Sequence, residues 1–273
     1  MSTDIDQAFV RQYESDVHMA YQRMGSKLAN TIRKKTNVKG ESTTFQTVGR
    51  GSASQKSRHG NVPTMNISHA PVVCPMQDWY AADYIDDLDE LKINHDEKMV
   101  QVESGAAALG RKQDEIILSA FAATTSELAG TAAAISQTEI DAAFKWMGDA
   151  DVPENDRFWV VSPAGWLDLM AIVAFTNADY IGQNDLPYKG GMVAKSFMGF
   201  TFFGHSGLPG PSTAKESFAY HRSSTGSGSG KEISSRMDFV PEKDSIFANN
   251  KMSMGAVLID TIGCYKVTYN EDT

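Results

Sequence analysis

The sequence contains little of what a disulfide-stabilised, membrane-spanning or exported protein needs. Only two cysteines, Cys74 and Cys264, occur in 273 residues. So few thiols exclude a disulfide framework and indicate reduced thiols in a cytosol. No stretch approaches the ~20 consecutive apolar residues that span a bilayer. The N-terminal run MSTDIDQAFVRQYES is polar and acidic, unlike a signal peptide, so we expect neither export by that route nor a membrane partner.

The sequence also lacks a convincing catalytic or metal-binding motif. In GSGSGK, Thr225 stands where a Walker phosphate loop needs glycine and Glu232 follows the lysine, so we interpret the run as a flexible turn. GHSG lacks the spacing of a nucleophile elbow. The six histidines form no metal-ligand spacing with one another or with cysteine. DDLDELKINHDE departs from a calcium loop at Leu91 and Lys92. We therefore expect no catalytic, cofactor-binding or metal site.

One acidic and aromatic run, DWYAADYIDD, leaves two interpretations open. Its carboxylates could line a substrate cleft together with Trp79 and the tyrosines. Alternatively, Trp79, Tyr80 and Tyr84 anchor the base of the hairpin, while the aspartates cap a helix or face a partner's arginines. We favour the second interpretation, because no convergent second acid or base can be named.

What is present is enough apolar material for a core and an uneven distribution of charge. Hydrophobic residues make up 41% of the chain and charged residues 22%, with a formal net charge of −9. This balance excludes global disorder and argues against a dedicated nucleic-acid binder. Residues 11–60 carry ten basic against three acidic residues, whereas residues 77–115 carry eleven acidic against four basic residues. These are either two solvated faces or complementary surfaces through which one copy docks on another.

The pattern along the chain predicts a helix, an unsupported hairpin and then a long helix. Apolar spacing from Val10 to Ile32 predicts a first helix. STTFQTVG and TMNISHAPVVCPM predict two strands joined by a loop rich in glycine, serine and basic residues. A lone two-stranded hairpin is marginal in water, so this one is either floppy or held by a partner molecule. We favour the partner, because the strands carry β-forming residues rather than linker composition. An acidic turn-and-helix region follows, and then a helix from about 94 to 124.

The remaining sequence alternates between helices and strands and ends in strands. We expect helices at 139–147 and 163–174, and strands at 157–161, 197–203 and 218–221. Ser162 and Pro163 form an N-cap and N1 pair. Strands at 232–240, 245–254 and 255–269 should return to pack under the long helix, which would make the first lobe discontinuous in sequence.

Taken together, these parts resemble the major capsid protein of tailed phages, which has the Hong Kong 97-type fold. The strings that carry the resemblance lie between residues 25 and 263. They are GSKLANTIR, VGRGSASQKSRHGNV, DWYAADYIDDLDELKINHDE, ALGRKQDE, VVSPAGWLDLM, DYIGQNDLPYKGG and MSMGAVLIDTIG. Each string is weak by itself, and the combination is specific.

The resemblance implies an α+β fold with four parts. Residues 1–38 would be an N-arm, and residues 39–76 an extended β-hairpin loop that lies on an adjacent subunit. Residues 77–130 and 231–273 would form a peripheral domain with a long spine helix. Residues 138–230 would form an axial α/β domain. The expected function is structural: self-assembly into hexamers and pentamers of an icosahedral phage head that encloses double-stranded DNA.

The same resemblance assigns residues to three contact regions. The extended loop would contact a neighbouring subunit through Arg50, Lys56, Arg58 and His59. The acidic peripheral region would receive it through Asp83, Asp86, Asp87, Asp89 and Glu90. The capsomer-centre loop would present Gln183, Asn184, Asp185 and Lys189. Some proteins of this fold cross-link a loop lysine to a neighbouring asparagine. Here the pair would be Lys56 with Asn249 or Asn250, although no catalytic glutamate is marked.

The implied partners are further copies of the chain, a portal, decoration proteins and packaged DNA held non-specifically. Because the chain starts directly at the N-arm, we expect the scaffolding protein to be separate. The expected location is the virion, with the host cytoplasm as the place of assembly. Two other functions stay open at this point: an encapsulin shell that encloses enzymes, and a cytosolic α/β enzyme with a defined pocket.

Overall fold

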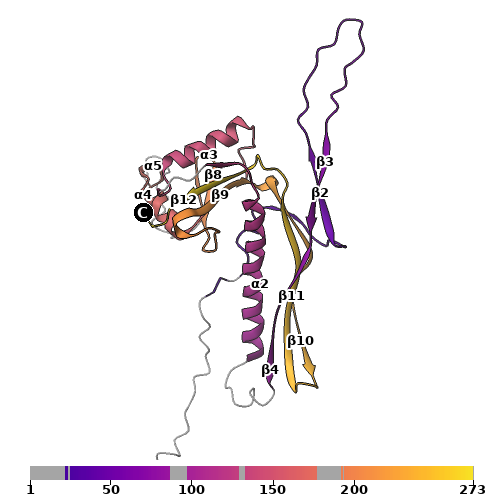
Figure 1. Cartoon of the computed structure of the whole chain (residues 1–273), viewed down its shortest axis with the longest axis vertical. Coiled ribbons are helices and arrows are strands. Elements are labelled where there is room, and N and C mark those ends of the chain that lie inside the picture. The colour runs from indigo at the N-terminus through magenta and orange to yellow at the C-terminus, as the bar shows by residue number, and fades with distance from the viewer. Residues whose placement is uncertain are drawn as a thin grey trace, which may run out of the picture. The chain divides into compact units, whose positions relative to one another are not determined.

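The fold comes from a computed structural model, which describes residues 22–23, 25–86, 97–128, 133–176, 192 and 194–272 (Figure 1). The described chain divides into two compact units. The first contains residues 22–25, 79–111 and 233–252, and the second contains residues 26–78, 112–232 and 253–272. The predicted capsomer-centre loop lies outside the described residues, as do Asp87, Asp89 and Glu90.

Six strands form a mixed sheet in the second unit. Their order is β5 (Glu127–Leu128), β12 (Cys264–Tyr269), β9 (Lys215–His221), β6 (Arg157–Val161), β8 (Phe200–Gly204) and β7 (Lys195–Phe197). β6 pairs in parallel with β8 and antiparallel with β9, and β9 pairs antiparallel with β12. The strands predicted at 157–161 and 218–221 are therefore confirmed. The single strand predicted at 197–203 is wrong, because Met198 and Gly199 adopt positive φ and form the tight turn of a hairpin between β7 and β8.

The two faces of this sheet bury different cores. Trp159, Val161, Phe202 and Ala219 belong to a core with residues of α3 (Gln137–Asp149) and α4 (Pro163–Ala171). Val160, Phe218 and Tyr220, which alternate with these residues along the strands, belong to a second core. This core also contains residues from 28–32 and from the last turns of α2 (Glu97–Ala122). This period-two division follows from the pleat, which points successive side chains to opposite faces.

The helices begin where the sequence places their caps. Ser136 and Glu139 form a capping box at the start of α3, and the Ser162 hydroxyl accepts from the Gly165 amide at the start of α4. Pro163 occupies the first turn, where its missing N–H costs nothing. A short helix, α5 (Val173–Thr176), follows. The long helix, predicted over about 94–124, is confirmed as α2 with 26 residues.

A second sheet has the order β1 (Arg33–Lys35), β10 (Thr225–Val240), β11 (Ser245–Leu258) and β4 (Gln77–Asp86). β1 runs parallel to β10, with Arg33 opposite Gly226. The third small sheet is a hairpin of β2 (Ser42–Val48) and β3 (His69–Pro75), which confirms the two strands predicted there. Figure 1 shows the long loop that joins β2 to β3.

Three further sequence predictions about elements were wrong. Residues 26–32 form turns that lead into β1, not the end of a helix. Leu28 and Ile32 have the spacing of a helical face, but they are buried as parts of these turns. The stretch 77–86 is the strand β4, not a turn-and-helix region. The run GSGSGK is a strand interior within β10, not a flexible turn. The earlier part of the predicted first helix lies outside the described residues.

The returning strands also differ from expectation. β10 and β11 join the sheet that contains β4, but β12 pairs with β9 of the six-stranded sheet. Its six residues alternate between buried and half-buried positions, with Val267 and Tyr269 in the core beneath α3 and α4. Pairing with β9 lets both faces of β12 pack against core residues, which a strand lying under one helix would not achieve.

Candidate functional site

The most distinctive surface feature is the hairpin, which has a buried base and an exposed distal loop. Phe45 pairs with Val72 across the hairpin. On β2, Thr43 and Phe45 are buried, while the residues between them face solvent. Cys74 is fully buried on β3, and burial raises the pKa of its thiol. One face of the hairpin base is therefore packed on other strands of its own unit. The chain itself holds the base, whereas the sequence predicted that a partner molecule would.

The surface beneath the hairpin base is made of glycines. A Cβ atom added at Gly226 would come within 2.6 Å of the Phe45 ring, and one at Gly228 within 2.8 Å of Thr43 Cγ2. On the neighbouring strand, a Cβ at Gly255 would lie 1.9 Å from the carbonyl oxygen of Pro75. We call Gly226, Gly228 and Gly255 the glycine seat. Only residues without a side chain allow the hairpin to approach β10 and β11 so closely.

Backbone hydrogen bonds and one cation complete the attachment of the base. The Val38 amide donates to the Ser229 carbonyl at 3.0 Å, and the Met76 amide donates to the Glu41 carbonyl at 2.8 Å. The Arg33 guanidinium lies 5.7 Å from the centre of the Phe45 ring, within the range of a cation–π contact. The first hydrogen bond ties the start of the hairpin to β10, and the second joins the two ends of the hairpin to each other.

The distal loop has a different character from the base. Residues 51–59 and 61–66 are exposed, and Lys56, Arg58 and His59 are among them. Two apolar side chains are also largely exposed, Val62 at 74% and Met65 at 52%. The structure therefore brings three of the four predicted loop residues together on one exposed segment.

The fourth predicted loop residue, Arg50, has a partner in its own chain. Its guanidinium lies 3.4 Å from the Asp151 carboxylate and also donates to the Ala150 carbonyl. Both side chains of this ion pair are mostly exposed, so the pair contributes at most about 1 kcal/mol. The contact lies beside a cleft of about 500 Å³ between the hairpin base and residues 150–153, 221–224 and 259–263.

The predicted acidic surface is partly described. Asp83 and Asp86 are exposed on β4 in the first unit. The Tyr84 ring lies 4.7 Å from that of Phe247, and Lys243 stands 3.7 Å from the centre of the Tyr84 ring. Tyr84 therefore packs on Phe247 of β11 and on Lys243, not on the hairpin base as predicted, and Tyr80 is largely exposed. The carboxylates of Asp83 and Asp86 remain at the surface.

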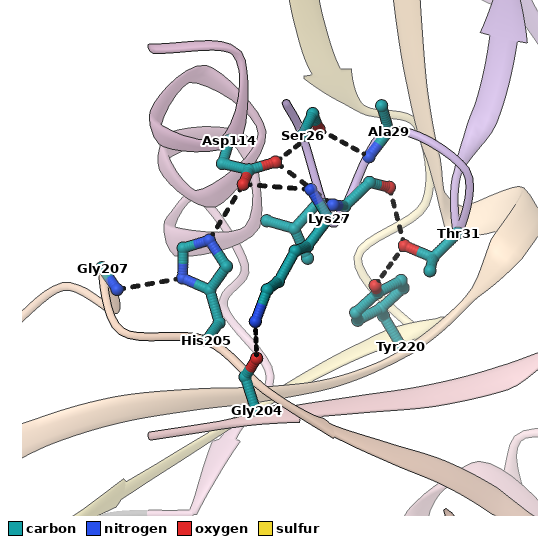
Figure 2. A network of polar contacts seen from close by, with 10 residues as sticks. Ser26, Lys27, Ala29, Thr31, Asp114, Gly204, His205, Gly207 and Tyr220 are labelled. Atoms are coloured by element: carbon teal, nitrogen blue, oxygen red, sulfur yellow. Dashed lines mark hydrogen bonds and ion pairs between the residues drawn. The ribbon is translucent and has the colours of Figure 1, made fainter. Parts of the chain in front are cut away.

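A buried polar network, which sequence reasoning missed, fixes the segment that precedes the hairpin (Figure 2). The Asp114 carboxylate on α2 accepts from the Ser26 hydroxyl at 2.5 Å and from the amides of Lys27 and Leu28. His205 Nε2, which follows β8, lies 3.0 Å from the same carboxylate. The Gly207 amide donates to Nδ1 of this histidine, so Nε2 carries the proton that is donated to Asp114.

The electrostatics of the network follow from these bonds. Burial raises the pKa of Asp114, whereas hydrogen bonds from His205, Ser26 and two backbone amides lower it. Together the hydrogen bonds outweigh burial, so the pKa lies below its ordinary value. Nearby, Lys27 donates to the Gly204 carbonyl, and the Thr31 hydroxyl contacts the Tyr220 hydroxyl. Because the carboxylate already accepts four hydrogen bonds, it acts as an anchor rather than as a general base.

Metal-binding groups, membrane-spanning helices and cysteine pairing can be checked for the described residues. Within the described ranges, no three His, Cys, Asp or Glu side chains form a group that could hold a metal ion. None of the helices described is both long and apolar enough to cross a bilayer. The cysteines predicted to be reduced are both free and buried.

Comparison with known proteins gives a consistent result. Residues 5–271 match a family described as phage capsid protein. No curated protein sequence matches the chain. A capsid structure of the cyanophage P-SCSP1u superposes with a TM-score of 0.80 at 18% identity and covers 98% of this chain and 95% of its own.

Two further structures have the same fold at similar identity. One, from Mycobacterium phage Che8, has a TM-score of 0.76 at 19% identity over 97% of this chain and 98% of its own. The capsid of a native GTA particle has a TM-score of 0.73 at 12% identity, with 96% of each chain covered. The α+β fold of the Hong Kong 97 type predicted from the sequence is confirmed by this likeness.

Proposed function

This chain belongs to the phage capsid protein family, and we propose that it builds its shell by placing its hairpin on a neighbouring copy. It is a major capsid protein of a phage head and a structural component of the virion. Self-assembly is therefore its function, and the contact surfaces between copies are its functional sites.

The observation that carries the proposal is the division of the hairpin into a seated base and an exposed distal loop. Lys56, Arg58 and His59 lie on the exposed loop beside Val62 and Met65. A loop of this composition gains stability by burying its apolar side chains and pairing its cations on another surface. The exposed carboxylates of Asp83 and Asp86 on β4 provide the complementary charge.

The finer organisation that we propose is the one that the family resemblance implies. Residues 1–38 serve as the N-arm, 39–76 as the extended loop, 77–130 with 231–273 as the peripheral domain and 138–230 as the axial domain. Copies form hexamers and pentamers of an icosahedral shell. We assign the capsomer-centre role to residues 183–189, and we include Asp87, Asp89 and Glu90 in the acidic receiving surface, on the family resemblance alone, because these residues lie outside the described part of the chain.

We also propose partners for the assembly and filling of the shell. A separate scaffolding protein guides assembly in the host cytoplasm, a portal occupies one vertex, and decoration proteins bind outside. The net charge of −9 disfavours tight binding to packaged double-stranded DNA, so contact with the DNA is weak and non-specific. The chain itself performs no turnover. An encapsulin-type shell and a cytosolic enzyme are not favoured, because the family is that of phage capsids.

The test is electron microscopy of the purified protein, expressed alone and together with the gene for its scaffolding partner. Closed particles or ring-shaped capsomers are the expected result. Particles that carry an enzyme cargo would favour the encapsulin alternative. A small monomer at every concentration, with turnover activity, would favour the enzyme and contradict the proposal.

A further inference from the structure

Contacts with β10 and β11 define the direction in which the hairpin extends from the rest of the second unit. We propose that the glycine seat (Gly226, Gly228 and Gly255) sets this direction and that its glycines are positioning residues for assembly. The proposal rests on the assembly function proposed above.

The contacts occur at each level of the hairpin base. The three ring atoms of Phe45 nearest to a Cβ at Gly226 are Cζ, Cε1 and Cε2, at 2.6 to 2.8 Å. At Gly228, a Cβ would meet Thr43 Cγ2 at 2.8 Å and Met76 Sδ at 3.0 Å. At Gly255 the obstacle is backbone, the Pro75 carbonyl oxygen at 1.9 Å. The hairpin therefore rests on backbone atoms at three points.

Glycine at alternate positions of β10 has no other evident use. A glycine in a strand interior weakens the strand, since it loses more conformational freedom and packs no side chain. Gly226, Gly228 and Gly230 share one face of β10, and Val38 O lies 3.1 Å from a Cβ placed at Gly230. The hairpin approaches Gly226 and Gly228 closely, and the segment before the hairpin approaches Gly230. This close approach explains why these three positions of β10 lack a side chain.

A small displacement of the hairpin at the glycine seat produces a larger displacement of its distal loop, because the loop lies far from the seat. Thr43 and Phe45 are about 7 Å apart along β2, and Arg58 lies up to ~45 Å beyond Phe45 at about 3.4 Å per residue. A lift of about 1 Å at one end of the seat thus moves the tip by several ångström. A contact between charged side chains does not survive such a displacement.

The experiment introduces a methyl group at the seat with Gly226→Ala and compares it with Gly148→Ala. Gly148 lies exposed on α3, and nothing lies within 4 Å of a Cβ there. We expect both variants to fold, by circular dichroism and thermal unfolding. Gly226→Ala should raise the concentration needed for particle formation about tenfold, which corresponds to ~1.4 kcal/mol. Gly148→Ala should assemble as the unaltered chain does.

A compensating variant distinguishes positioning from simple damage to β10. Leucine lacks the three ring atoms of Phe45 that oppose Gly226, so Phe45→Leu makes room for the added methyl group. The double variant Gly226→Ala with Phe45→Leu should assemble better than Gly226→Ala alone. Equal assembly defects in the two, or normal assembly of Gly226→Ala, would overturn the proposal.

If Gly226→Ala does not fold, Phe45→Ala provides the second measurement. It removes the ring that rests on the seat and leaves β10 unchanged. We expect a folded subunit that assembles poorly, and normal assembly would overturn the proposal. Failure of the unaltered chain to form particles would instead contradict the proposed function, so the two failures are distinguishable.

Discussion

At the scale of single residues, Asp114 connects more of the second unit than any neighbouring side chain shown in Figure 2. It holds the turn at 26–28 against α2 and orients His205 after β8. Nothing in the local sequence marks this role, because its partners lie 86 to 91 residues away. Only the fold brings the acceptor and its donors together.

We predict that Asp114→Asn destabilises the subunit. An amide has one acceptor oxygen in place of two, so at least one buried donor among Ser26, Lys27, Leu28 and His205 loses its partner. Each lost partner costs about 1–3 kcal/mol. Urea unfolding of the unassembled subunit measures the loss. Glu115→Gln is the matched control, since its exposed side chain should leave stability within about 0.5 kcal/mol.

The same carboxylate predicts a pH dependence. The folded pKa of Asp114 is below the ordinary value of 3.8, so its ionised form stabilises the native state. This contribution is fully present above pH 3.8 and is lost as pH falls through the lower folded value. In acid unfolding, the unaltered chain should lose more stability below pH 4 than Asp114→Asn does. Equal pH profiles would show that Asp114 does not contribute in this way.

At the scale of elements, the sequence predicted those whose stability is local. α4 was recognised from Ser162 and Pro163, and α2 from its apolar spacing. The two hairpin strands were recognised from their β-forming residues. The capping and spacing signals act within a few residues, so they survive without knowledge of the tertiary structure.

The elements that were missed depend on contacts with distant residues. GSGSGK has the composition of a turn, and only the hairpin lying on it explains a glycine strand. The signal available in the sequence was the strict alternation of glycine at 226, 228 and 230, which is the period of a strand. β4 was obscured in a similar way, because its acidic residues suggested a helix start although Trp79, Ala81 and Ile85 alternate in burial.

We predict that reversing the loop charges weakens assembly and leaves the subunit folded. Lys56→Glu with Arg58→Glu places anions on an exposed loop, where a substitution changes folding stability by no more than about 0.5 kcal/mol. Against an acidic neighbour the same change is repulsive. Sedimentation should show a loss of particles, while thermal unfolding of the subunit stays unchanged.

The exchange Lys56→Arg with Arg58→Lys is the control for this charge reversal. It retains both charges and should assemble. Raising the ionic strength should weaken assembly of the unaltered chain more than that of the reversed variant, because salt screens exposed charges. Unfolding of the reversed variant, or assembly equal to that of the control, would contradict docking through the loop.

At the scale of the whole molecule, assembly should change what a protease can reach. Lys56 and Arg58 are trypsin sites on an exposed loop. In the unassembled subunit we expect trypsin to cut there first, giving two fragments that mass spectrometry identifies. In assembled particles the same bonds should be protected, since a neighbouring copy covers them. Equal cleavage rates in the two states would show that the loop stays exposed in the shell.

The division of the hairpin into a fixed base and an exposed end also bears on how a shell finishes growing. If copies dock as proposed, every incoming copy brings one hairpin loop and one surface that can receive a loop. A partial shell therefore always has a rim at which some loops and some receiving surfaces remain unmatched. A closed shell has no rim and so leaves no loop unmatched. The number of matched contacts therefore favours a closed shell over an open sheet or tube of the same subunit.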